Sequence, residues 1–253
     1  MRKGIFASPW ADPAYKYFLR FFQSPYFTQL LGNTLIISLA KLALSMPFAI
    51  AMAILLSEAR SNKFRRIVQT VTYMPHFLSW VILYGILFAF LSETRGLVNL
   101  MLRNMGFPAV NFLSSPRWFR SLVVFSTLWK ETGWGAIIYL AAIIGVDPTL
   151  YEAARVDGAG RLRSIWHITL PGIRAVTIVM FLLKLGSILD AGFDQIYIMY
   201  NIHVYSVGDI IDTWVFRTGL EQWNFSMATA VGLFKSLIGL ALIAGMNALA
   251  RRW

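Results

Sequence analysis

Residues 147–173 have the sequence DPTLYEAARVDGAGRLRSIWHITLPGI and predict two short helices joined by a turn. Asp147 is a favourable N-cap residue, and Pro148 suits the first helical position, where no backbone N–H is needed. Gly158 can adopt the left-handed conformation that ends a helix, and Pro171 can open the next helix. We therefore expect this stretch to project from its surroundings as a pair of short amphipathic helices.

Apolar stretches lie on both sides of this segment. Five of them reach or approach the roughly 20 residues that a helix needs to cross about 30 Å of hydrocarbon. They cover residues 30–56, 67–91, 121–145, 173–200 and 227–249. Asp190 and Asp194 interrupt the fourth stretch, and we expect neighbouring helices to shield its outer half. The sequence thus predicts an all-α, polytopic transmembrane helical bundle.

Composition supports the same class of protein. Of the 253 residues, 57% are hydrophobic and 14% are charged, and the mean hydropathy is +0.60. The sequence has no cysteine, which excludes disulfides and thiolate metal sites, and we expect neither a metal nor a cofactor. The net charge of +11 falls largely in short segments between apolar stretches. This placement favours contact with anionic lipid headgroups over nucleic acid.

The N-terminal residues 1–28 are rich in aromatic and basic residues and are typical of an amphipathic segment at the membrane interface. If residues 57–66, residues 147–174 and the C-terminal tail are cytoplasmic, they carry 10 positive residues, against 5 in the two long loops on the other side. Residues 1–28 add four to that other side, because an odd number of spans puts the N-terminus there. We take this conflict to indicate a further span before the sequence given.

The spacing within residues 147–173 resembles the EAA motif of binding-protein-dependent importer permeases, which is EAA, three residues, G, nine residues, I, one residue and LP. The alternative is an ordinary amphipathic loop between two spans. The matching residues are Glu152, Ala153, Ala154, Gly158, Ile168, Leu170 and Pro171.

The resemblance implies a mechanical role for this segment. In such permeases it forms a coupling helix that enters a groove on a separate cytoplasmic ATPase, so that closure of the ATPase dimer switches the permease between inward-open and outward-open states. We expect Ala153 and Ala154 to allow close approach, Glu152 to meet a basic partner, and Gly158, beside Asp157, to set the angle between the helices.

Other stretches resemble the carbohydrate branch of that family, and the subgroup that works with lipoprotein binding proteins. They are YMPHFLSW (73–80), WKETGWGAIIYLAA (129–142) and NFSMATAVGLFKS (224–236). The resemblance implies a bacterial inner-membrane subunit of the MetI-like permease type, with the transmembrane domain over residues 29–253 and the coupling loop over 147–172. It also implies a sugar as solute, a second and different permease subunit, ATPase subunits and a solute-binding lipoprotein. Members usually have one more N-terminal span.

Ionisable residues within the apolar stretches are candidates for the solute path, because charges in hydrocarbon usually face a cavity or a partner. On a continuous helix Lys184, Ser187, Asp190 and Asp194 would share one face. Lys130 and Trp134 share another, while Glu131 points away from it. Relatives place sugar contacts at about these heights, which implies that Lys130, Trp134, Lys184 and Ser187 line the path. The candidates are Lys130, Glu131, Trp134, Lys184, Ser187, Asp190 and Asp194.

Two structural interpretations of these charges stay open. They could form ion pairs within the bundle or with a partner permease, or they could extend toward the membrane surface. His76 follows Pro75, which should kink the second span, and we expect His76 to take a hydrogen-bonded packing role rather than to relay protons.

Enzymatic activity is not expected, because the sequence shows no phosphate-binding G-x-x-x-x-G-K-[ST] loop and no nucleophile with its base. Two other classes of membrane protein remain as alternatives. An ion-coupled secondary transporter would normally show two related halves, and a membrane-embedded enzyme or assembly factor would need a tight group of acidic or histidine residues.

Overall fold

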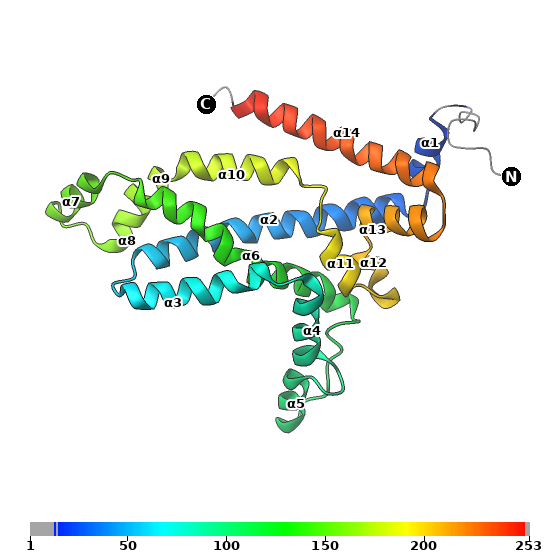
Figure 1. Cartoon of the computed structure of the whole chain (residues 1–253), viewed down its shortest axis with the longest axis horizontal. Helices are drawn as coiled ribbons and strands as arrows, with labels where there is room; N and C mark the ends of the chain where they lie inside the picture. Colours follow the sequence, from blue (N-terminus) through cyan, green and yellow to red (C-terminus); the bar gives the residue numbers. More distant parts are fainter. Residues whose placement is uncertain (1–12, 14, 251–253) are drawn as a thin grey trace.

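The computed structural model describes residues 13 and 15–250, and within them every regular element is a helix. Long helices run side by side along the molecule, as Figure 1 shows. They are α2 (Phe27–Ser57), α6 (Pro116–Ile144), α10 (Arg174–Gly186) and α14 (Phe225–Ala250). The expected all-α bundle is therefore confirmed.

Small residues bring α2 and α6 together in the centre of the bundle. Ala49 and Ala53 of α2 and Ala136 of α6 are buried in one apolar cluster, together with larger side chains such as Leu56 and Tyr139, and these small residues let the two backbones approach closely. Gly133, on α6, lies so close to the helix that follows α2 that a β-carbon there would overlap the carbonyl oxygen of Thr72. The core therefore depends on close backbone contact.

The second expected span, 67–91, is sharply bent. It consists of α3 (Asn62–Tyr73), a 3₁₀ turn (Met74–Phe77) and α4 (Trp80–Leu91), and the two halves meet at 107°. Pro75 lies in the turn and is buried; proline lacks an N–H and interrupts helical hydrogen bonding. The expected kink is thus a change of direction, and α4 leaves the bundle sideways.

The fourth expected span, 173–200, is not one helix. Helix α10 ends at Gly186, and the next helix, α11 (Phe193–Met199), begins only after a break that contains Gly192 with φ of +90°. The single polar helix face expected for Lys184, Ser187, Asp190 and Asp194 is therefore wrong, because these residues do not share a helix.

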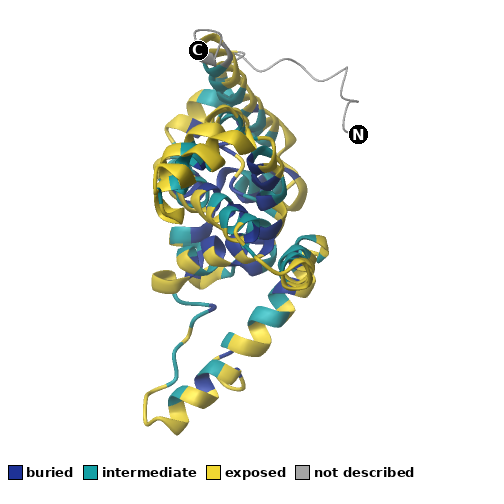
Figure 2. Cartoon of the chain, turned by 90° about the vertical axis from the view of Figure 1, so that its left-hand side faces the viewer, coloured by how far each residue is buried: buried dark blue, intermediate teal, exposed yellow. Residues whose placement is uncertain are grey.

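Helix α4 and α5 (Leu97–Asn104) form an arm that projects from the body (Figures 1 and 2). The buried Asn99 side chain holds the arm together, because its amide nitrogen donates to the carbonyls of Leu91, Ser92 and Val110 at 3.4, 3.1 and 3.0 Å. The arm is therefore internally braced although much of it is exposed.

Short helices lie around the N-terminal end of α2. They are α12 (Tyr205–Gly208), α13 (Ile211–Phe216) and a π-helical turn, η5 (Arg217–Glu221). The N-terminal helix α1 (Lys16–Phe22) packs here through Phe21, which is 1% exposed and lies in one cluster with Leu30, Ile211 and Val231. Of the interfacial segment expected over 1–28, residues 1–12 and 14 lie outside the described residues.

Two described helices are by themselves long and apolar enough to cross a membrane, namely α2 and the Phe225–Met246 part of α14. The number rises to five if each bent helix pair counts as one span. The expected spans 30–56, 121–145 and 227–249 correspond to the single helices α2, α6 and α14. The expected spans 67–91 and 173–200 look continuous in sequence but are each broken into more than one helix.

We expect Gly133→Ala to destabilise the chain by about 1–3 kcal/mol, because the added methyl group overpacks the contact with Thr72. Gly32→Ala in α2 is the matched control: no atom lies within 4 Å of the added carbon, and alanine favours the helix by up to about 1 kcal/mol. Thermal unfolding of the purified chain in detergent measures both. Equal melting temperatures for the two variants would contradict the close contact.

Candidate functional site

The segment 147–173 folds as a helical hairpin at one end of the molecule (Figure 1). Its first helix is α7 (Pro148–Val156), and Asp147 caps it by accepting a hydrogen bond from the Thr149 N–H at 2.9 Å. Hydrogen bonds from the backbone and the hydroxyl of Thr149 lower the pKa of Asp147 below its usual value. The expected N-cap and first-position proline are both present.

Gly158 ends α7 as expected, with φ of +76°. The N–H of Ala159 donates to the carbonyl of Ala154 at 2.8 Å, and the N–H of Gly158 donates to that of Arg155 at 3.1 Å. This pair of bonds is a complete Schellman motif, which requires a left-handed residue at the position of Gly158. The angle between the two arms of the hairpin is therefore set by one glycine.

The second arm runs through α8 (Arg161–Ser164), the π-helical turn η3 (Ile165–Thr169) and α9 (Leu170–Gly172). The hydroxyls of Tyr151 and Thr169 lie 3.0 Å apart and join the two arms. Helix α9 then meets α10 at 59°. Because the hairpin continues directly into α10, a displacement of the hairpin acts on that helix.

The residues of the EAA motif divide into two groups. Glu152, Ala153, Asp157, Gly158 and Pro171 are exposed, whereas Ala154, Ile168 and Leu170 are partly buried. The same hairpin carries exposed apolar side chains that are not among the predicted site residues: Val156 is 87%, Leu162 75% and Trp166 67% exposed. Within a motif these residues carry no distinguishing pattern, and only the structure shows them as an apolar surface next to Glu152.

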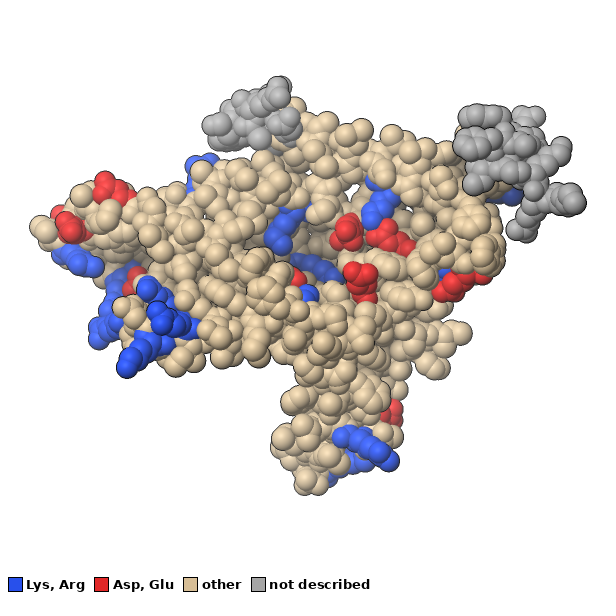
Figure 3. Space-filling view, viewed as in Figure 1, with Lys and Arg blue, Asp and Glu red and all other residues tan. Residues whose placement is uncertain are grey.

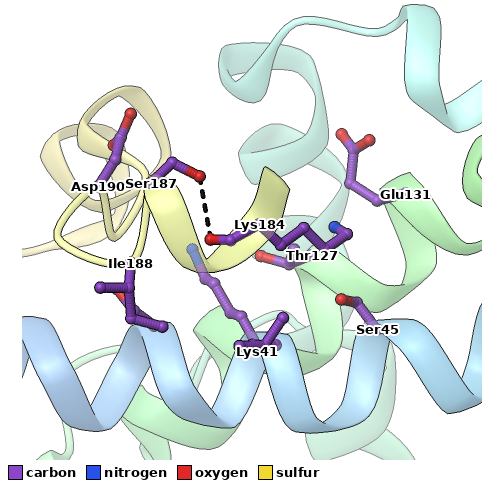
Figure 4. A pocket seen from close by; sticks show the side chains of 10 residues that line it. Lys41, Ser45, Thr127, Glu131, Lys184, Ser187, Ile188 and Asp190 are labelled. Carbon is purple, nitrogen blue, oxygen red and sulfur yellow. Dashed lines mark hydrogen bonds between the residues drawn. The ribbon is translucent and has the colours of Figure 1, made fainter. Parts of the chain in front are cut away.

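A polar cavity of about 160 Å³ lies in the middle of the bundle, between α2, α6 and the end of α10. Lys184, Ser187 and Asp190 reach it from α10 and the break that follows, and Glu131 reaches it from α6, as Figure 4 shows. Figure 3 shows charges of both signs in this region. The break after Gly186 thus brings together residues that a continuous helix was expected to align.

Helix α2 also lines this cavity, with Ser38, Lys41 and Ser45, none of which is among the predicted site residues. A lysine within the apolar stretch 30–56 was the available signal. The Lys41 ammonium donates to the carbonyl of Ala191 at 2.6 Å and to the side-chain oxygen of Gln195 at 2.5 Å. It therefore ties α2 to the break between α10 and α11.

Gln195 extends this connection to α6. Its side chain is fully buried, its nitrogen donates to the Val123 carbonyl at 2.7 Å and to the Ser126 hydroxyl at 2.8 Å, and its oxygen accepts from Thr127 at 3.0 Å. Ser38 differs, because its hydroxyl is buried at the cavity without a hydrogen-bond partner. Gln195 and Lys41 thus fix the part of the cavity wall where α2, α6 and the break after α10 meet.

Lys130 lies away from the cavity and is 8% exposed. Its ammonium donates to the carbonyls of His76 and Leu78, both at 2.6 Å, and to that of Pro75 at 3.3 Å. These carbonyls lie where the turn between α3 and α4 interrupts helical hydrogen bonding, and that of Pro75 also accepts from the N–H of Leu78 at 3.2 Å. Lys130, expected to line the path, thus stabilises the bend within this chain, and its contact with a solute stays a prediction.

The remaining candidate residues for the solute path also lie in different places. The Glu131 carboxylate lies 3.0 Å from Nδ1 of His76, whose ring stacks on Trp134 with centroids 4.5 Å apart. His76 thus has the hydrogen-bonded packing role expected for it. Trp134 is not among the residues that line the cavity, and Asp194 is exposed at the start of α11.

The family model for the "Binding-protein-dependent transport system inner membrane component" matches residues 45–253. The chain belongs to this family. It is 46% identical over 250 residues to the polygalacturonan/rhamnogalacturonan transport system permease protein YteP of Bacillus subtilis, covering 99% of this chain and 77% of that protein. Protein LplB of the same organism is 44% identical over 250 residues, covering 99% and 78%.

Among solved structures, a permease chain of a bacterial ABC transporter for the acidic polysaccharide alginate has a TM-score of 0.93 and 40% identity, covering 98% of this chain and 86% of that one. Members of this family are inner-membrane components of binding-protein-dependent transport systems. The chain is accordingly a multi-pass bacterial inner-membrane permease component, and the EAA resemblance is confirmed.

We expect Lys130→Met to destabilise the chain by about 1.5–3 kcal/mol, because three carbonyls in the turn lose a charged donor. Lys184→Met should change stability by no more than about 0.5 kcal/mol, since Lys184 is exposed and its ammonium makes no hydrogen bond or ion pair with a described residue. Thermal unfolding in detergent compares the two variants. A larger loss for Lys184→Met would contradict the roles assigned to these lysines.

Proposed function

We propose that this chain is the permease subunit of an ATP-driven importer, and that a separate ATPase drives it through the hairpin 147–173. The observation that carries this proposal is the hairpin itself: it is capped by Asp147, turned by Gly158 and tipped with exposed Val156 and Leu162. Apolar side chains this exposed at a rigid projection are typical of a protein interface.

The residues of this chain indicate how a movement of the hairpin would reach the central cavity. Helix α10 links the hairpin to the central cavity without an intervening loop, since α9 ends at Gly172 and α10 begins at Arg174. A push on the hairpin therefore moves Lys184 and Ser187 relative to α2. Because the sequence holds no phosphate-binding loop, the ATP must be hydrolysed by a partner.

We further propose that the solute is an acidic oligosaccharide. The relative YteP is described as a polygalacturonan/rhamnogalacturonan permease, and the similar solved structure as an importer of the acidic polysaccharide alginate. In the central cavity the Lys41 ammonium is held by Ala191 and Gln195, and Glu131 by His76. Lys184 is thus the cation left to meet a solute carboxylate.

The other partners follow from the same relatives. One similar structure is a complex with an oligosaccharide-bound periplasmic protein, which supports a solute-binding partner here. We propose a second, different permease subunit, an interfacial role for residues 1–28 and a transmembrane domain over 29–253. An ion-coupled secondary transporter or a membrane-embedded enzyme would have no use for the exposed hairpin.

Substitution of Gly158 tests the coupling. Gly158→Val should abolish co-purification of the ATPase and solute-stimulated ATP hydrolysis, because a β-branched residue is strained at φ of +76°. Gly158→Asn is the matched control, since asparagine tolerates the left-handed region, and should retain most activity. An ATPase that stays bound and stimulated in the valine variant would exclude this hairpin as the coupling element.

Substitution of Lys184 tests the solute. Loss of one charged hydrogen bond in Lys184→Gln should lower uptake of oligogalacturonate about tenfold, and should change uptake of a neutral oligosaccharide of equal length less than about twofold. Lys184→Arg keeps the charge and should keep the preference. An equal loss for acidic and neutral sugars in reconstituted vesicles would show that Lys184 does not recognise the carboxylate.

A further inference from the structure

A second cavity, of about 460 Å³, lies at the end of α2 opposite the hairpin 147–173. It is separate from the central cavity and shares no lining residue with it. Its volume falls within the range of about 300–1,000 Å³ that is usual for small-molecule sites. Its walls come from the start of α2, from α12 and α13, and from the segment 217–224 that follows them.

The lining combines aromatic rings with amides and hydroxyls. Tyr26, Tyr205 and Trp214 supply the rings, and Gln29, Gln222 and Asn224 supply the amides. Aromatic rings suit the C–H face of a sugar ring, and amides suit its hydroxyl rim. No described residue hydrogen-bonds the side chain of Gln222, which is exposed at the cavity.

Arg217 is fixed in the cavity wall and its charge is compensated. Its guanidinium donates to the Asp209 carboxylate at 2.6 and 3.2 Å and stands over the Tyr205 ring, 4.8 Å from the centroid. Asp209 is 4% exposed and is also held by Thr213 at 2.8 Å. Because Asp209 neutralises Arg217, the cavity lining has no unpaired charge that could select an acidic ligand.

The backbone beside the cavity is irregular in two successive places. Residues Arg217–Glu221 form a π-helical turn, a feature frequent at functional sites. Trp223, between the lining residues Gln222 and Asn224, has φ of +57° and is the non-glycine residue with a positive φ in the described part of the chain. A bulky residue is strained there.

Packing does not explain why a tryptophan bears this strain. The Trp223 side chain is 68% exposed, and its described ring contact is an edge-on one with Phe225, 5.9 Å between centroids. The packing of this ring therefore contributes little to the stability of the fold. Trp223 does not itself line the cavity, but both of its neighbours in sequence do, and an exposed ring next to a cavity of aromatic rings and amides offers a surface on which a sugar ring can stack.

We propose that the cavity lined by Tyr26, Trp214, Gln222 and Asn224, together with the exposed ring of Trp223 between the last two, binds a saccharide unit through ring stacking and hydroxyl hydrogen bonds. The inference rests on the proposed transport of an oligosaccharide and adds a second, charge-independent site to it. Gln29 and Lys41, from the two cavities, are twelve residues apart on α2, about 18 Å along the axis. The second site holds the solute before it reaches the central cavity.

The two sites therefore differ in what they recognise. The second site should accept neutral and acidic sugars alike, because Asp209 neutralises Arg217. The central cavity should favour the acidic sugar through Lys184. This difference lets one experiment separate the two proposals.

The test is photolabelling of the purified transporter complex in nanodiscs with two probes, trigalacturonate and maltotriose, each carrying a diazirine. Labelled peptides are mapped by mass spectrometry, with excess unlabelled trisaccharide as competitor. We expect both probes to label residues 217–224. Trp223→Asn removes the ring and tolerates the backbone, and Gln222→Ala keeps the ring; each should reduce this label about fivefold and leave the label at 184–190 unchanged.

Phe107→Asn is the control, because Phe107 is an aromatic residue of similar exposure, 57%, outside both cavities. It should leave all labelling unchanged. Label confined to 184–190 overturns this inference and leaves the proposed function standing. Label at neither segment in a complex that imports the trisaccharide overturns it too, as does label at 217–224 that neither variant reduces. If residues 217–224 cross-link to the solute-binding protein and to neither sugar probe, the segment is a protein contact, and this result also overturns the inference.

Discussion

A backbone carbonyl inside a bilayer finds no water, so each interruption of a helix must be satisfied by the protein itself. The ammonium of Lys130 does this for the turn between α3 and α4, where it takes three carbonyls at once. Lys41 does the same at the break between α10 and α11, through the carbonyl of Ala191 and the amide of Gln195. These two lysines allow the chain to bend within the bundle, and without the bends neither the projecting arm nor the central cavity would form.

The breaks and the long helices have complementary tasks. Helices α2 and α6 are in close contact along their small residues and form the fixed part of the molecule. Helix α10 is attached to the hairpin at one end and reaches the cavity with Lys184 and the adjoining Ser187 at the other. Motion imposed at Gly158 can therefore change the cavity while the α2–α6 contact persists. This division suits a subunit that must move solute without losing its membrane seal.

Local chemistry made much of this structure predictable. The N-cap at Asp147 and the left-handed Gly158 depend on neighbouring residues and can be predicted from them. The break after Gly186 cannot, because residues 173–200 are apolar enough to suggest one helix, and the stabilising contact from Lys41 comes from a distant part of the chain. The carbonyl contacts of Lys130 could not be predicted for a related reason: sequence marks an ionisable residue in hydrocarbon but does not distinguish one that faces a solute from one that caps a bend.

Lys130 and Lys41 meet their hydrogen-bond partners at different stages of synthesis. The carbonyls that Lys130 meets precede it by 52 to 55 residues, so they are already in place when α6 emerges from the ribosome. Lys41 enters the membrane 150 residues before Ala191 is made. During that interval its charge has no final partner, at a cost of roughly 2.5–3.5 kcal/mol on insertion scales, and the strongly apolar sequence of α2 is what allows the helix to insert regardless. Early biogenesis, rather than the finished fold, therefore sets how many polar residues α2 can carry.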